Sequence, residues 1–371
     1  MKKLPLLGAI AALMFSACQP AETGPIKIGF VGPLTGGIAS IGVVMRNAAE
    51  LRVKEINDAG GINGRMIQLV IEDGKCTGAD AASAGQKLVS IDKVVAIHGG
   101  ECSGETLAIA PITEEAGIVL LSPISSSPDV SQAGDFVFRN YPSDALKTVA
   151  MAHYFAAQGY KRIAILSENT DFCTAFRDSL KEELGDDMEI VFDEVVEPET
   201  KDFRTLMARL KDTEFDVFFS NANLATTMGL MVQQFREQGL TQPIISHDVG
   251  ETPEVVQLAG EAAEGFRVIN LPSVGEETDF GKKYIAAYGK PESAMAFAAH
   301  SYDAMDILAK AIAAVGTDGT AMRDYLNSMG EYTGMAGAFS FDENGDALGY
   351  NYALREVQNG QFVTAELIPV D

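Results

Sequence analysis

The sequence is short of the residue types on which several classes of function depend. Its 371 residues include 28 lysines and arginines against 52 aspartates and glutamates, which gives a formal net charge of −24 at pH 7. A surface with so few cations repels phosphate backbones and anionic headgroups, so we expect no nucleic-acid partner. There are only four histidines and four cysteines, without a Cys-x-x-Cys spacing, which argues against a zinc site.

The motifs of common nucleotide-dependent and hydrolytic enzymes are also missing. Residues 29–36 follow an apolar run but do not read G-x-G-x-x-G. The sequence has no G-x-x-x-x-G-K-[ST] phosphate loop and no G-x-S-x-G nucleophile elbow. The histidines are scattered, with no nucleophile at a recognisable spacing. We therefore expect a binding protein rather than an enzyme, with no catalytic residues, no metal and no cofactor.

The chain begins with the features of an export signal. Two lysines precede an apolar stretch, Leu4–Phe15, that is too short to cross a bilayer as a helix. The run Phe15-Ser16-Ala17-Cys18 resembles a bacterial lipobox, in which the cysteine carries the lipid. We expect a lipoprotein signal peptide over 1–18 and a tether over 19–25. An ordinary secretory signal with an incidental cysteine is the alternative.

These features predict a protein that is exported to the periplasm or the cell surface and held at the membrane only by the lipid on Cys18. No later segment approaches eighteen uninterrupted apolar residues. The remaining cysteines then lie in an oxidising compartment, where pairing is expected. A bond between Cys76 and Cys102 would close a modest loop, which the chain-entropy model values at about 3 kcal/mol. Cys173 is left over, either as an unpaired buried thiol or as a redox sensor.

From residue 26 onward, short apolar strands alternate with helical patterns. Strands alternating with helices of about ten to fifteen residues indicate βαβ units and parallel sheets. The pattern restarts after Tyr141, which predicts two doubly wound units whose ligands bind beyond the carboxyl ends of the strands. The predicted strands are 26–32, 65–73, 94–97 and 118–122 in the first unit, and 162–167, 188–195, 217–220, 244–246 and 265–270 in the second.

Polar residues follow two predicted strands of the first unit. Ser103 opens a helix after strand 94–97, and the N-terminal N–H groups of a helix favour an anion. A serine-rich loop, 125–127, follows strand 118–122. Helix capping and turn formation explain these residues equally well.

Six stretches of the chain, taken together, match one known family: 28–36, 55–64, 118–123, 201–203, 262–265 and 300–304. They resemble the leucine/isoleucine/valine-binding proteins and their amino-acid-binding relatives. The resemblance implies the type I periplasmic binding fold, an α/β fold of two Rossmann-like lobes with parallel sheets joined by three hinge crossovers. It implies an N-terminal lobe over 26–141 plus 270–332 and a C-terminal lobe over 142–269 plus 333–371. It also implies a disulfide between Cys76 and Cys102.

The function implied by this resemblance is that of a solute-binding protein of an ABC importer. The ligand would be an amino acid or a close analogue, enclosed between the lobes. The expected partners are this small molecule and the permease and ATPase complex of the importer, and we expect a monomer. A sensory, amide-binding or urea-binding lipoprotein of the same fold is the alternative.

By resemblance, four residues contact the charged end of the ligand. Ser103 would hold the α-carboxylate, while Ile124 and Ser126 would bind the carboxylate and the amine. Asp248 would pair with the ammonium, and a ligand without an amino group would then leave this carboxylate buried and unpaired.

Other expected cavity residues depart from the family pattern. Phe172 stands where a tyrosine is usual, and Asn223, or else Asn221, occupies the region of a second tyrosine. Ile41, where a tryptophan is often found, and Phe297 are expected to form walls around the ligand side chain.

Glu101 stands where an apolar residue would touch an aliphatic ligand. We expect it to contact a polar or basic group, which favours a ligand other than leucine, isoleucine or valine. A solvent-facing glutamate at the mouth of the cleft is the alternative.

Overall fold

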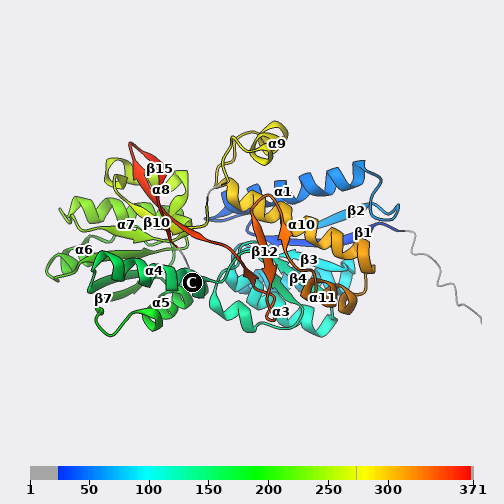
Figure 1. Cartoon of the computed structure of the whole chain (residues 1–371), viewed down its shortest axis with the longest axis horizontal. Helices are drawn as coiled ribbons and strands as arrows, with labels where there is room; N and C mark the ends of the chain where they lie inside the picture. The colour runs from blue at the N-terminus through cyan, green and yellow to red at the C-terminus, as the bar shows by residue number, and fades with distance from the viewer. Residues whose placement is uncertain (1–23, 273, 369–371) are drawn as a thin grey trace, which may run out of the picture.

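The computed structural model describes residues 24–272 and 274–368. Two α/β lobes lie side by side, with the blue and cyan strands in one and the green strands in the other (Figure 1). The fold expected from the sequence, two lobes with largely parallel sheets, is confirmed. The export signal and Cys18 lie outside the described residues, so lipid attachment stays a prediction.

The first lobe is built on a five-stranded parallel sheet in the order β2-β1-β3-β4-β5. Both faces of the sheet are covered, which explains why its strands are nearly continuous apolar runs. Phe30 packs into one core cluster with helices α1, α10 and α11, while the next residue, Val31, packs into another with α2 and α3. The strands are β1 Ile26–Gly32, β2 Ile67–Asp73, β3 Ala96–Gly99, β4 Val119–Ser122 and β5 Val137–Arg139. The helices are α1 Ala39–Asp58, α2 Gly78–Lys87, α3 Ser103–Ala116, α9 Asp279–Tyr288, α10 Met295–Val315 and α11 Gly319–Asn327.

The second lobe has a seven-stranded sheet in the order β15-β14-β10-β9-β8-β6-β7. Strands β14 and β15 add to one edge in antiparallel pairing, and the other five are parallel. Its strands are β6 Arg162–Glu168, β7 Glu189–Val196, β8 Val217–Asn221, β9 Ile244–Ser246, β10 Arg267–Asn270, β14 Tyr352–Gln358 and β15 Gln361–Ile368. Its helices are α4 Asp144–Gln158, α5 Asp171–Glu183, α6 Arg204–Lys211, α7 Ala225–Glu237 and α8 Pro253–Ala259.

A small sheet belongs to the first lobe, although the sequence predicted that residues from 333 onward belong to the second. Strands β11 (Tyr332–Thr333), β12 (Ala338–Phe341) and β13 (Ala347–Leu348) form it. Phe339 and Ala347 pack into the same core cluster as Phe30. The buried Arg139 of β5 also binds the Asp346 carboxylate at 2.6 Å. The expected boundary at 333 therefore lies too early, and the third crossing between the lobes falls between β13 and β14.

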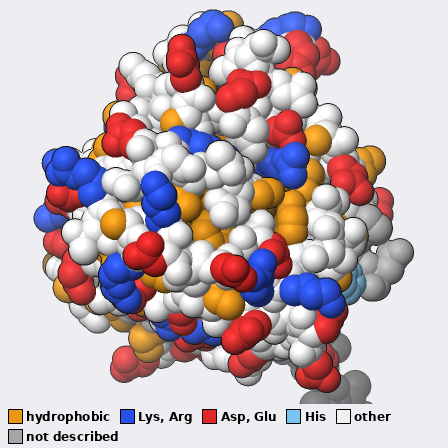
Figure 2. All heavy atoms as spheres, turned by 90° about the vertical axis from the view of Figure 1, so that its left-hand side faces the viewer, with side chains coloured by type: hydrophobic (Ala, Val, Ile, Leu, Met, Phe, Trp, Pro, Cys, Tyr) orange, Lys and Arg blue, Asp and Glu red, His pale blue; other side chains and the backbone are white. Residues whose placement is uncertain are grey.

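The acidic excess of the chain lies on a surface of mixed charge. Figure 2 shows one end of the molecule, where red acidic and blue basic side chains are interspersed. Exposed ion pairs such as that of Arg162 with Asp216, at 3.0 Å, each contribute about 0–1 kcal/mol. Within the described ranges, no helix combines the length and the apolar character that crossing a membrane requires.

Candidate functional site

A cavity lies between the two lobes, with about 470 Å³ of space unoccupied by atoms, including its opening to solvent. Its walls are loops and helix starts that follow the carboxyl ends of β1, β3, β4, β6, β8 and β9, where open α/β sheets bind their ligands. The structure brings all nine predicted ligand-binding residues to this cavity, and their contact with a ligand stays a prediction. They are Ile41, Glu101, Ser103, Ile124, Ser126 and Phe297 from the first lobe, and Phe172, Asn223 and Asp248 from the second.

One wall is suited to a carboxylate. Ser103 is the first residue of α3, where the leading backbone N–H groups have no intrahelical partner. Its Oγ accepts a hydrogen bond from the Ser127 N–H at 3.2 Å, which ties it to the loop carrying Ser126. Both serines that face the cavity are buried. Hydroxyl groups and a helix N-terminus on one wall can hold an anion without any basic side chain.

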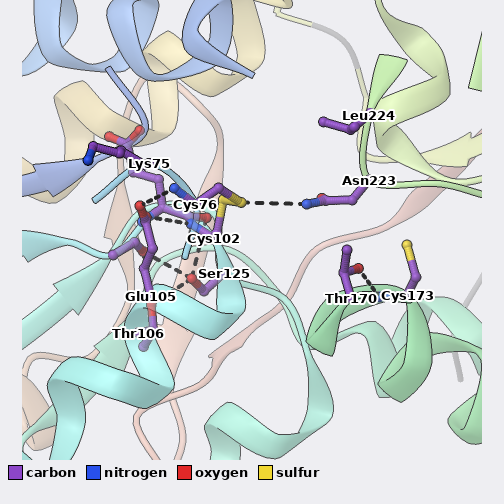
Figure 3. Close-up of a disulfide and its surroundings, with 12 residues drawn as sticks. Lys75, Cys76, Cys102, Glu105, Thr106, Ser125, Thr170, Cys173, Asn223 and Leu224 are labelled. Carbon is purple, nitrogen blue, oxygen red and sulfur yellow. Dashed lines mark hydrogen bonds between the residues drawn. A yellow bond between two sulfur atoms is a disulfide. The ribbon is translucent and has the colours of Figure 1, made fainter. Parts of the chain in front are cut away.

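The loop that carries Glu101 and Ser103 is fixed by a disulfide and a buried carboxylate (Figure 3). Cys76 and Cys102 are bonded, as the family resemblance implies. The Glu105 carboxylate accepts hydrogen bonds from the N–H groups of Cys76 at 2.9 Å, Glu101 at 2.9 Å and Cys102 at 3.1 Å. Burial raises the pKa of Glu105, and the three N–H groups oppose this rise. The main chain beside the cavity is therefore held in place before a ligand arrives.

Glu101 points into the molecule and is only 2% exposed. The alternative prediction, a solvent-facing glutamate at the mouth of the cleft, is therefore wrong. Neither of its carboxylate oxygens has a hydrogen-bond partner among the described residues. Burial, and then repulsion by Glu105, raise its pKa well above the usual value. It packs so closely on Gly32 that a Cβ at that position would lie 2.5 Å from Oε2. The glycine at the end of β1 thus leaves room for the Glu101 carboxylate.

Asp248 has partners within the protein, so it does not need the ammonium group of a ligand to avoid being buried and unpaired. Its Oδ2 accepts a hydrogen bond from the Tyr141 hydroxyl at 2.8 Å, and its Oδ1 lies 3.2 Å from both Lys147 Nζ and His247 Nδ1. Although burial opposes it, the Lys147 charge with these hydrogen bonds holds the pKa of Asp248 below its usual range. A ligand without an ammonium group would therefore leave Asp248 partnered, and that argument for an amino-acid ligand is wrong.

Lys147 is a component of the site that the sequence reasoning missed. It is fully buried on α4. Besides Asp248, its Nζ also lies 2.8 Å from Asp144 Oδ1. This contact is a close ion pair, but its angles are not those of a hydrogen bond. A signal was available, because Lys147 shares one helix face with the buried Met151 and Tyr154, four and seven residues on. A lysine in such an apolar stripe needs a buried acidic partner.

The second lobe closes the cavity with an aromatic ring and an amide. The Phe172 ring, at the start of α5, meets His247 edge to face with centroids 4.9 Å apart. The Asn223 backbone N–H donates to Glu168 Oε2 at 2.7 Å, which fixes the loop after β8. Asn221 is fully buried and bonded to His247, so Asn223 is the asparagine that lines the cavity.

Four further lining residues were not predicted: Pro33, Ile38, Cys102 and Val249. Ile38 joins Ile41, Met45 and Phe297 in a small apolar cluster. Sequence reasoning missed Ile38, because α1 begins without a capping side chain that would mark where the helix starts. The cavity thus combines an apolar wall with polar groups at Ser103, Asp248 and Glu101. No group of side chains that could hold a metal ion occurs among the described residues.

Two α/β lobes with largely parallel sheets, with a cavity between them, are the architecture of a solute-binding protein. The family described as Periplasmic binding protein matches residues 25–361, and the chain belongs to this family. The leucine-, isoleucine-, valine-, threonine- and alanine-binding protein of Pseudomonas aeruginosa is 27% identical over 363 residues, 96% of each chain. The branched-chain amino acid transporter substrate-binding protein LivJ of Streptococcus pneumoniae, solved with isoleucine, is 28% identical with a TM-score of 0.83, covering 93% of this chain and 99% of that one.

These comparisons identify a substrate-binding protein of the type that serves branched-chain amino acid ABC transporters, and not an enzyme. Proteins of this family bind small molecules for transport. A solute-binding protein of R. palustris, solved with benzoate, shares the fold at 20% identity, with a TM-score of 0.80 and coverage of 93% and 96%. The fold alone therefore does not determine the ligand.

Proposed function

We propose that this chain binds an amino acid or a close analogue between its lobes and presents it to an ABC importer. The observation that carries the proposal is the single cavity in which Ser103, Ser126 and the start of α3 lie on the first lobe and Asp248 on the second. A zwitterion matches this arrangement, with its carboxylate toward the helix start and its ammonium toward Asp248. Relatives that bind aliphatic amino acids support the assignment.

Affinity of the expected size needs only a few contacts. Hydrogen bonds to charged groups contribute roughly 1.5–3 kcal/mol each, and micromolar affinity corresponds to about 8 kcal/mol. Four or five such bonds to a zwitterion are sufficient after part of this energy is used to close the lobes. Asp248 already has partners within the protein. The wall of Ser103, Ser126 and the start of α3, which would hold the ligand carboxylate, therefore contributes more to the preference for an amino acid than Asp248 does.

The location of the protein is proposed on separate grounds. Family members are periplasmic, and the lipobox-like run ending at Cys18 supports attachment to a lipid. We propose an exported lipoprotein, anchored only through this cysteine. Cys18→Ala should move the protein from the membrane fraction to the soluble extract, and unchanged membrane attachment would contradict the anchor.

A thermal-shift screen followed by calorimetry tests the ligand class. The screen should contain the twenty amino acids, small amides, urea and benzoate. A true ligand raises the melting temperature in proportion to the logarithm of its concentration over its dissociation constant. We expect stabilisation by at least one amino acid. Stabilisation by an amide, urea or an aromatic acid alone would overturn the amino-acid assignment and leave the transport class intact.

A further inference from the structure

We propose that Glu101 makes the cavity selective for an amino acid whose side chain ends in a cationic N–H donor group, an ammonium or a guanidinium. The inference rests on the proposed function, because it concerns the far end of the same ligand. Glu101 lines the cavity and is 2% exposed, and both of its carboxylate oxygens lack a partner among the described residues. A buried acid without partners is unfavourable unless something else supplies them.

The Glu101 side chain has no structural task that would explain its burial. The capping of α3 is performed by Glu105, whose carboxylate accepts the N–H groups of Glu101 and Cys102. The Glu101 carbonyl oxygen accepts a hydrogen bond from Ser125 Oγ at 3.4 Å. The main chain is thus held on both sides, and Glu101 lines the cavity from a fixed backbone.

No positive charge of the protein balances this carboxylate. None of the lining residues is Lys, Arg or His. The neighbouring walls supply apolar groups from Pro33, Ile41 and Phe297, and the charge that acts on the pKa of Glu101 is that of a second acid, Glu105. Lys147, across the cleft, is already paired with Asp144 and Asp248. A positive charge that pairs with an ionised Glu101 would therefore have to come from the ligand.

The arrangement along the cavity fits a long basic side chain. Ser103 lies two residues after Glu101, so the two ends of the ligand would be held by one rigid loop. The apolar wall of Ile38, Ile41 and Phe297 can cover the methylene groups of such a side chain, as apolar surfaces do for lysine and arginine stems. An aliphatic ligand would leave both Glu101 oxygens without a partner, and an acidic one would add a further negative charge.

Proton release is a direct consequence. In the free protein, burial and the Glu105 charge raise the pKa of Glu101 well above its usual value, which favours the protonated carboxyl group. When a cationic side chain binds, the carboxyl O–H bond breaks, the proton passes to the buffer, and the carboxylate pairs with the cation. Affinity for a basic amino acid should therefore rise with pH until it passes the pKa of the free protein. An uncharged ligand would release no such proton.

Titration calorimetry with matched ligands tests the proposal. Arginine is compared with citrulline, and lysine with norleucine, in two buffers that differ in ionisation enthalpy. Because bonds to charged groups are involved, the protein should prefer the basic member of each pair by about ten- to a hundredfold. The apparent heat should differ between buffers for the basic ligands only.

Two variants and a control complete the test. Glu101→Gln should remove the preference and the proton release, and Glu101→Leu should reverse the preference toward norleucine and leucine. Glu115→Gln, at an exposed position on α3, should change neither. Thermal unfolding verifies that each variant is folded, and Glu101→Leu, with no buried acid, should be the more stable of the two.

The outcomes separate the inference from the proposed function. Tight binding of leucine or norleucine, with weak binding of lysine and arginine and no effect of Glu101→Gln, would overturn the inference and leave the amino-acid function standing. If no amino acid binds while the protein is folded, both the function and the inference are overturned.

Discussion

The side-chain amide of Asn223 reaches across the cleft to the disulfide of the opposite lobe, with Nδ2 3.5 Å from Cys76 Sγ (Figure 3). The next residue, Leu224, packs on Gly37, where an added Cβ would lie 3.0 Å from Leu224 Cδ2. Glu168 holds the N–H groups of both residues, at 2.7 and 3.0 Å. A positioned loop of the second lobe thus contacts the first lobe at the edge of the cavity, as expected of a closed arrangement.

Removing this contact should weaken ligand binding. Asn223→Ala deletes a weak interlobe N–H···S contact, at the lower end of the roughly 0.5–1.5 kcal/mol of a hydrogen bond, so we expect a loss of affinity of about twofold. Calorimetry with the ligand found in the screen measures the loss. Asn327→Ala, an exposed position at the end of α11, is the matched control and should bind normally. Equal affinity in both variants would show that the contact plays no part in closure.

The disulfide should contribute strongly to stability. Cys76 and Cys102 are separated by 26 residues, and closing such a loop stabilises the fold by roughly 3–4 kcal/mol in the chain-entropy model. We expect the double variant Cys76→Ala/Cys102→Ala to unfold at a correspondingly lower urea concentration. Dithiothreitol should destabilise the unmodified protein and have no effect on the variant. If the reductant shifted both equally, the effect would have to come from elsewhere in the chain.

The alternation of strands and helices was sufficient to predict the lobes and the edge of the sheets where a cavity forms. Strand-end position alone left Ser103 equally well explained by helix capping, and the family resemblance was needed to place it in the site. What the sequence pattern could not give was pairing between distant segments. That Asp248 meets Lys147, and that residues 333–348 return to the first lobe, depends on tertiary contacts between chain segments far apart. Local periodicity contains no information on these contacts.

Lys147 should contribute far more to the stability of the fold than an exposed lysine that forms an ion pair. Lys147→Met would leave Asp144 and Asp248 buried without their cation, and losing one partner of a buried pair costs about 3–5 kcal/mol. The matched control is Lys161→Met, because Lys161 pairs with Asp187 at 3.1 Å on the surface and should contribute about 0–1 kcal/mol. Urea unfolding at pH 8 measures both.

The loss in Lys147→Met should also depend on pH. Without the lysine, the pKa of the buried carboxylates would be higher in the folded than in the unfolded protein, so the folded state would bind more protons. The destabilisation should therefore be smaller at pH 5 than at pH 8. A loss of the same size at both pH values would mean that the carboxylates are not buried as the structure describes.

His300 should make stability dependent on pH between about 4 and 6.5. Burial lowers the pKa of its imidazole to about 4, although its bond to the Asn140 carbonyl oxygen at 3.0 Å and the Asp248 charge oppose the shift. In the unfolded chain the histidine has its ordinary pKa. The unfolded chain therefore takes up a proton over this pH interval, and the folded protein does not. The contribution of His300 to the free energy of unfolding is thus largest above pH 6.5 and falls as the pH drops toward 4.

Each buried histidine of this kind contributes up to about 1.4 kcal/mol per pH unit to this slope. His98, whose pKa burial also lowers to about 4, gives the second contribution. We expect His300→Gln to reduce the slope by about half a proton near pH 6.5 and by nearly one proton near pH 5, measured by urea unfolding at several pH values. His153→Gln serves as the control, because His153 is exposed on α4. An unaltered slope in His300→Gln would mean that this imidazole does take up a proton in the folded protein.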